Sequence, residues 1–172
     1  MHRPRQLKLD QVDLQILNDL QNNGRMTNVE LAERAGISAP PCLRRIRVLE
    51  ENNYILGYHA HINSEALGYG VTIFAQVSVI SHAEQDLNAF EQLVSSWPQV
   101  RECYMLAGET DFLLKIVASD WDSYQRFLTT KLTSAPNVKH VKSSLAIRLS
   151  KFSPGIPIES HEKMNEKVHQ KM

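Results

Sequence analysis

Apolar residues recur at helical spacing in three stretches of the first 60 positions, and each stretch begins at a capping residue. The first stretch follows Asp10, and the second follows Thr27, which forms a capping box with Glu30 three residues later. The third follows Ser38, and two prolines then occupy the first turn, where a missing N–H costs nothing. Gly36, between the last two stretches, can end a helix in the left-handed conformation. The pattern predicts three short helices, the last two forming a helix-turn-helix.

Each of these helices has an apolar side that we expect to be buried in a shared core. The first helix presents Val12, Ile16, Leu17 and Leu20. On a wheel of about 100° per residue, the sides of the other two are Val29, Leu31, Ala32 and Ala35, and Cys42, Leu43, Ile46 and Leu49.

The opposite side of the third helix is basic. Arg44 lies nearly opposite Ile46, and Arg45 and Arg47 project from the two flanks. Planar guanidinium groups placed in this way suit phosphates, or guanine edges in a DNA major groove. An ordinary solvated charged face is the simpler interpretation of three arginines alone, but the caps and the glycine turn favour DNA binding. The candidate DNA-contacting residues are Thr27, Ser38, Pro40, Arg44, Arg45 and Arg47.

A different pattern begins after residue 70, where strand-like and helical runs alternate. The expected strands are 71–80, 100–107, 111–118 and 138–149, and the expected helices are 83–97 and one that begins after Asp120. The second helix is expected to point Trp121, Tyr124, Leu128 and Leu132 inward. The order predicts a ferredoxin-like βαββαβ domain with both helices on one sheet face. The fold class is therefore α+β, with an N-terminal three-helix, winged helix-turn-helix domain.

Both faces of the predicted sheet are substantially apolar. Along the first strand, Phe74 and Ile80 fall on the side opposite Ile73, Val77 and Val79. An isolated antiparallel sheet does not tolerate two apolar faces in water. We therefore expect a homodimer formed through the sheets, which also supplies the two-fold symmetry of DNA half-sites.

Composition shifts divide the chain into four parts. They are a helix-turn-helix domain over 1–60, a hinge over 61–70, a ferredoxin-like domain over 71–150 and a tail over 151–172. Residues 54–62 have a strand-like pattern, which predicts a short wing or the first strand of a connector.

Charge and composition exclude few functions. The 172 residues carry 19 Lys or Arg and 19 Asp or Glu, yet local potential controls phosphate binding, so double-stranded DNA stays the expected partner. No 18-residue apolar run and no signal core occur, which predicts a cytoplasmic protein without membrane contact. Cys42 and Cys103 are expected to be buried free thiols. His59 and His61 share one face without a third ligand, so we expect no metal and no cofactor.

Several short motifs carry a family resemblance. In the first domain they are Leu9-Asp10 with Asp13, Ile16-Leu17, Asn28-Val29-Glu30-Leu31-Ala32, Gly36-Ile37-Ser38, Pro41-Cys42-Leu43-Arg44-Arg45-Ile46 and Ile55-Leu56-Gly57-Tyr58. In the second they are Glu102-Cys103-Tyr104 and Gly108-Glu109-Thr110-Asp111-Phe112-Leu113-Leu114. With these motifs in this order, from about residue 9 to 150, the chain resembles the Lrp/AsnC family, the feast/famine regulators.

The resemblance implies a transcription regulator whose second domain assembles homodimers, often into octamers, and binds an amino-acid effector. It places the effector near the hairpin turn, at an interface between dimers. Backbone N–H groups at the Gly108 turn suit the carboxylate of an amino acid, and Asp111 suits its ammonium. A plain hairpin turn is the alternative for these residues. The effector-binding residues implied are Gly108, Glu109, Thr110, Asp111, Trp121, Leu145 and Ala146.

Two other functions stay open. An enzyme similar to siroheme decarboxylases would use histidines near the strand-to-turn region, and residues 105–111 contain none. A nucleoid-associated architectural protein, wrapping DNA with little sequence preference, would have a more basic head than residues 1–60. We therefore expect a sequence-specific regulator without enzymatic activity.

Overall fold

The computed structural model describes residues 7–158, which form two compact units. The first unit consists of residues 7–61 together with 151–158, and the second of Ile62–Ser150. The predicted tail is therefore part of the first unit as far as residue 158, and residues 159–172 lie outside the described part of the chain. No helix among the described residues combines the length and apolarity needed to cross a membrane.

The first unit contains the three predicted helices, α1 (Gln11–Asn22), α2 (Asn28–Arg34) and α3 (Ala39–Glu51). Thr27 and Glu30 form the predicted capping box, and Gly36 takes φ +67° after α2. The core between the helices consists of Ile16, Leu20, Leu31, Ala32, Cys42, Ile46 and Leu49. The strand predicted over 54–62 is not formed, because no segment in the described residues pairs with it in a ladder.

Two apolar residues expected in this core are on the surface instead. Val29 is 58% exposed and Leu43 is 40% exposed. Val29 lies two positions before Leu31, about 200° away around the helix, so only one of the two can face the core. Leu43 lies at the edge of the buried side of α3, next to Arg44. The buried stripes are therefore narrower than predicted.

An ion pair joins α1 to α2. The Asp19 carboxylate is buried, and it accepts hydrogen bonds from Nε and Nη2 of Arg34, each at 2.9 Å. Gln15 Nε2 donates a third bond to Asp19 Oδ2 at 2.9 Å. These hydrogen bonds, the one from Arg34 first, hold the pKa of Asp19 below its ordinary value of 3.8.

Residues 151–158 are bound to the first unit by specific contacts. The Gln21 side chain donates from Nε2 to the Ile156 carbonyl at 2.9 Å and accepts from the Ile156 N–H at 3.1 Å. Gly155 takes φ +69°, and a Cβ there would lie 2.1 Å from Gln21 Oε1, so the position requires glycine. The Phe152 ring stacks on His61 with centroids 4.3 Å apart.

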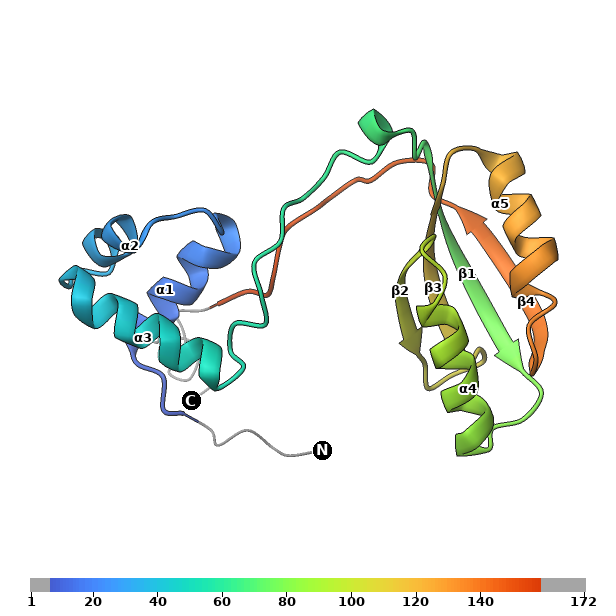
Figure 1. The fold of residues 1–172 in the computed structure, drawn as a ribbon, viewed down its shortest axis with the longest axis horizontal. Helices are drawn as coiled ribbons and strands as arrows, with labels where there is room; N and C mark the ends of the chain where they lie inside the picture. Colours follow the sequence, from blue (N-terminus) through green and yellow to red (C-terminus); the bar gives the residue numbers. More distant parts are fainter. Residues whose placement is uncertain (1–6, 159–172) are drawn as a thin grey trace, which may run out of the picture. The chain divides into compact units, whose positions relative to one another are not determined.

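The second unit is a four-stranded antiparallel sheet with two helices on one face. Its strands are β1 (Val71–Val79), β2 (Val100–Met105), β3 (Phe112–Ala118) and β4 (Val138–Leu145), in the order β2-β3-β1-β4 (Figure 1). The helices are α4 (Glu84–Ser95) and α5 (Trp121–Phe127), which continues as a π turn over Leu128–Leu132, and a 3-10 turn, η1 (Glu65–Leu67), precedes β1. This is the predicted ferredoxin-like arrangement, and that prediction is confirmed.

The two faces of the sheet divide as the alternation predicts. Ile73, Val77 and Phe112 are fully buried in the core beneath the helices. Phe74 is 37% exposed on the other face, where Lys115 Nζ also bonds Glu102 Oε1 at 2.6 Å. The homodimer through this face stays a prediction.

Two side chains of the second unit are more exposed than expected. Trp121, expected to point inward, is 47% exposed because it is the first residue of α5 and the buried position is Tyr124, three residues later. Cys103, expected to be buried, is a free and exposed cysteine, whereas Cys42 is free and buried as predicted.

Acid should destabilise the first unit through Asp19. Because the folded-state pKa of Asp19 is lowered, the ionised carboxylate contributes stability above pH 3.8, and this contribution is lost as the pH falls through the folded pKa. Asp19→Asn should lower the free energy of unfolding at pH 7 by about 2 kcal/mol, because Arg34 loses its partner. Urea unfolding of the full chain followed by circular dichroism at pH 7 and pH 3 measures both effects.

Glu33→Gln, an exposed change on α2, is the control and should unfold like the unmodified chain. Equal stability of the Asp19→Asn variant and the unmodified protein at pH 7 would contradict this account of the ion pair.

Candidate functional site

The start of α3 is held beside the start of α2. Asn28 Nδ2, in the first turn of α2, donates to the carbonyl of Ala39, the first residue of α3, at 2.9 Å. Thr27 and Ser38, the two N-caps, therefore lie along one edge of the unit. Ser38 makes no capping hydrogen bond and is exposed, so its hydroxyl is available to an external acceptor. The structure thus places Thr27, Ser38 and Pro40 along one edge of the first unit, and their contacts with DNA stay a prediction.

Arg44 and Arg47 both stand on the exposed side of α3. Their separation of three positions places them on neighbouring parts of one helix face. Neither guanidinium takes part in an ion pair within residues 7–158. The two guanidinium groups, with the exposed Leu43 beside them, therefore face outward from α3.

Arg45 has a different environment from the one expected of a phosphate contact. Its Nη1 lies 2.7 Å from Asp10 Oδ2 and 2.7 Å from Asp13 Oδ1, at the capped end of α1. The hydrogen bonds to Asp13 and Asp10 raise the pKa of the Arg45 guanidinium. They leave its side chain one-third exposed. The contacts of Arg45 favour a positioning role that fixes α3 against α1.

The turn between β2 and β3 ends at Asp111, whose backbone is pinned on both sides. The Asp111 N–H donates to the Val77 carbonyl at 3.0 Å, and its own carbonyl accepts from the Leu106 N–H at 2.8 Å. Its carboxylate accepts from the Val79 N–H at 2.8 Å, and its other oxygen lies 2.7 Å from His82 Nε2. The Val79 N–H, and then His82, lower the pKa of Asp111. Asp111 is thus a fixed anionic group beside an exposed turn.

His82 is a residue of this site that sequence reasoning missed. It follows β1, and the end of β1 lies beside the start of β3 because the two strands are antiparallel. The only available signal was the position of this histidine, directly after the first strand of the predicted βαββαβ order, where the chain passes the start of β3. Its partner is 29 positions away, so no local pattern connects them.

The residues expected to bind the effector fall at opposite ends of the sheet. Gly108–Asp111 lie where β3 begins, whereas Trp121 follows the end of β3. Leu145 pairs with Ile73 near the start of β1, and the Ala146 N–H donates to the Thr72 carbonyl at 2.9 Å, also at that far end. Seven residues of strand separate the ends by about 20 Å. One chain alone does not bring all seven residues together, and effector binding at an interface between dimers stays a prediction.

Metal binding has little support in the described part of the chain. Residues 7–158 contain no group of three or more histidine, cysteine, aspartate or glutamate side chains placed to hold a metal ion. His61, one of the two histidines considered for such a site, is stacked on Phe152.

Comparison with known proteins adds independent evidence. Residues 9–55 match the family model described as a winged helix-turn-helix DNA-binding domain, and residues 72–156 match the Lrp/AsnC ligand binding domain. The chain is 50% identical over 142 residues to a leucine-responsive regulatory protein of Rhizobium meliloti, covering 83% of this chain and 91% of that protein. The chain belongs to the Lrp/AsnC family.

Other Lrp/AsnC proteins agree in sequence and fold. A Bkd operon transcriptional regulator of Pseudomonas aeruginosa is 39% identical, over 82% of this chain and 92% of that protein. The crystal structure of a transcriptional regulator of Neisseria meningitidis in complex with L-Met has a TM-score of 0.83 and 37% identity, covering 87% of this chain and 97% of that one. These relatives are named as transcriptional regulators, and this Lrp/AsnC chain is a DNA-binding transcriptional regulator.

The three arginines of α3 should separate in a stability measurement. Arg45→Gln should lower the free energy of unfolding by about 1–3 kcal/mol, because it leaves Asp10 and Asp13 facing each other without a cation. Arg44→Gln and Arg47→Gln, the matched controls, should unfold like the unmodified chain. Chemical unfolding of the full chain is the measurement, and unchanged stability of the Arg45→Gln variant would refute the positioning role.

Proposed function

We propose that this chain binds operator DNA as a homodimer, with each α3 in a major groove, and that an amino acid bound near Asp111 changes its DNA affinity. The observation that supports this most strongly is that the three arginines of α3 have different environments. Arg45 is held internally, whereas Arg44 and Arg47 point away from the core. Two exposed arginines on one face, beside a third that fixes the helix, suit a helix that binds an anionic partner better than a helix that only contacts solvent.

The roles of the DNA-contacting residues follow from their positions. Arg44 and Arg47 are the base-reading candidates, because a planar guanidinium can bond O6 and N7 of guanine together. Thr27 and Ser38 lie at helix N-termini, where hydroxyl and backbone N–H groups bind phosphate. Pro40 shapes the exposed first turn of α3. A neutral net charge does not oppose this function, because the potential near two exposed arginines is local.

The effector is an amino acid because the charges near the turn complement one. Asp111 supplies an anionic acceptor for an ammonium group, and the turn before it, exposed at Gly108 and Glu109, offers N–H groups for a carboxylate. The Neisseria relative was crystallised with L-Met, an effector of this class. His82 already contacts one Asp111 oxygen, so an incoming ammonium competes with its ring or takes its place.

The complete pocket takes residues from more than one copy of the chain. Trp121, Leu145 and Ala146 lie at the far end of the sheet from Asp111, so a second copy supplies them at an interface between dimers. An effector that bridges copies binds one assembly more tightly than another. That difference in affinity is what shifts DNA binding, since a ligand moves an equilibrium only by its differential affinity.

Removing either exposed guanidinium should weaken specific DNA binding. Arg44→Gln and Arg47→Gln should each reduce affinity for a cognate duplex about tenfold or more, because a bidentate base contact is lost. Gel shifts at fixed salt, on a duplex selected by the unmodified protein from a random library, measure this loss. Unrelated DNA as competitor reports the specificity ratio.

Arg101→Gln, an exposed change in the second unit, is the matched control and should bind like the unmodified protein. If the two α3 variants bind the selected duplex normally, α3 does not read DNA. An unmodified protein that binds selected and unrelated DNA equally would favour the architectural alternative.

Neutralising Asp111 should remove the effector response and keep DNA binding. Asp111→Asn retains an acceptor oxygen for the Val79 N–H but loses the charge that an ammonium requires. In a melting-temperature screen of L-Met and the other amino acids, at least one should raise the melting temperature of the unmodified protein. The Asp111→Asn variant should not show that rise. Lys131→Gln, an exposed change in the π turn after α5, serves as the folded control. An Asp111→Asn variant that still responds would show that the pocket lies elsewhere.

A further inference from the structure

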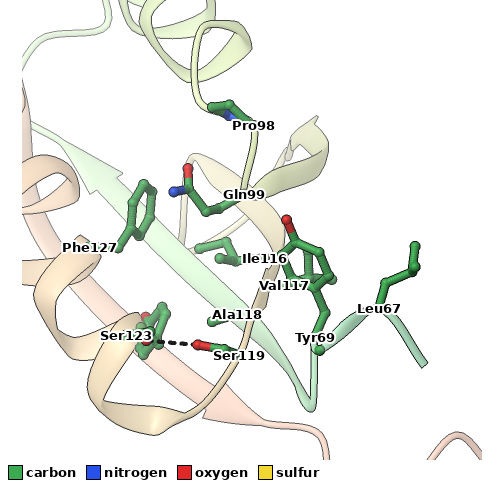
Figure 2. Close-up of a pocket in the computed structure, with 12 residues that line it drawn as sticks. Leu67, Tyr69, Pro98, Gln99, Ile116, Val117, Ala118, Ser119, Ser123 and Phe127 are labelled. Carbon is green, nitrogen blue, oxygen red and sulfur yellow. Dashed lines mark hydrogen bonds between the residues drawn. The ribbon is translucent and has the colours of Figure 1, made fainter. Parts of the chain in front are cut away.

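The second unit contains a cavity of about 380 Å³. The cavity lies at the Ala118 end of β3, whereas Asp111 lies at the other end of that strand. Its walls come from the segment before β1, the start of β2 and the inner side of α5 (Figure 2). The side chains that matter below are Tyr69, Gln99, Ser119, Ser123, Tyr124 and Phe127. None of the seven residues expected to bind the amino acid lines it.

Backbone contacts fix the shape of this cavity. The Val117 N–H donates to the Gln99 carbonyl at 2.9 Å, which holds the start of β2 against β3. The Gly70 N–H donates to the Ser119 carbonyl at 3.3 Å, and a Cβ on Gly70 would lie 3.0 Å from that oxygen. Glycine therefore allows the segment before β1 to approach β3 closely. The cavity is built from elements that are already tied together.

Gln99 carries a polar group that the described protein leaves unused. Its Oε1 is buried and has no hydrogen-bond partner among residues 7–158. The two serines in the wall are bonded, since the Ser119 hydroxyl lies 2.8 Å from Ser123 Oγ, which accepts from Arg126 Nη2 at 2.8 Å. Buried polar groups are normally paired, so an unpaired oxygen at a cavity marks a place where water or a ligand can donate a hydrogen bond. In Figure 2 the nitrogen of the Gln99 amide is the end that faces the Phe127 ring, and the oxygen points away from that ring.

The walls select the chemistry of that ligand. No charged residue lines the cavity, so an ionised or zwitterionic molecule would lose its hydration without a counter-charge. Tyr69, Tyr124 and Phe127 provide aromatic surface for a flat apolar body. A primary amide such as that of Gln99 offers both an acceptor and donors, and it pairs best with a neutral group that also does both.

We propose that this cavity is a second ligand site, distinct from the one at Asp111, for a small neutral molecule with an aromatic body and an amide or hydroxyl group. Gln99 pairs with the polar group, and the aromatic walls hold the body. The volume lies within the range of small-molecule sites. Within one chain the cavity lies at the end of β3 opposite to Asp111, and its wall residue Tyr124 packs against Trp121, with ring centroids 5.4 Å apart.

Benzamide is the probe, and its binding to the full chain is measured by calorimetry. It should bind saturably with one molecule per chain. Gln99→Leu, which keeps the side-chain size, should weaken binding at least tenfold because the paired amide is lost. Gln125→Leu, the same change at an exposed position of α5, should bind like the unmodified protein. Benzoate, which has the same shape but a charge, should bind at least tenfold more weakly than benzamide.

Melting temperature, benzamide binding by an Asp111→Asn variant and competition with L-Met separate this site from a structural role of Gln99 and from the amino-acid site. Gln99→Leu should melt at the same temperature as the unmodified chain or higher, because it removes an unpaired buried amide; a lower melting temperature would make Gln99 structural. Asp111→Asn should leave benzamide binding unchanged, whatever happens to the amino-acid response. No saturable benzamide binding, equal binding by the Gln99→Leu variant, or displacement of benzamide by L-Met would overturn the proposal.

Discussion

The orientation of α3 depends on the Arg45 guanidinium, which lies between two carboxylates at the beginning of α1. Asp10 and Asp13 already cap α1, so the same two side chains start one helix and position another. Because their charges are used internally with Arg45, the rotation of α3 about its axis is set. Arg44 and Arg47 are then directed outward. One arginine of the three serves the fold, and the other two remain exposed on α3.

The helices and strands could be predicted from the sequence because their signals are local. Capping residues lie three positions apart, and strand alternation has a period of two, so both the order of elements and the buried sheet face followed from short patterns. Burial at the ends of short helices was harder to predict. Val29 and Trp121 each lie within the first turn of a seven-residue helix, where one turn decides which side faces the core.

The contacts at the candidate sites could not be predicted, because they join residues distant in sequence. Arg45 and Asp10 are 35 positions apart, and His82 and Asp111 are 29 apart. Residue types indicated that Arg45 and Asp111 were functional, but not which neighbour would neutralise their charges, and His82 was missed. The orphaned oxygen of Gln99 gave no signal at all, since glutamine in a loop is ordinary and only packing shows that it is buried.

The return of residues 151–158 to the first unit makes the second unit an insertion within the first, in terms of chain connectivity. Gln21 and His61 contact residues 151–158, so the first unit is connected to the second by two stretches of chain where a simple tandem arrangement has one. A chain cut after residue 150 would therefore lose residues that belong to the first unit, although every strand of the second unit would remain.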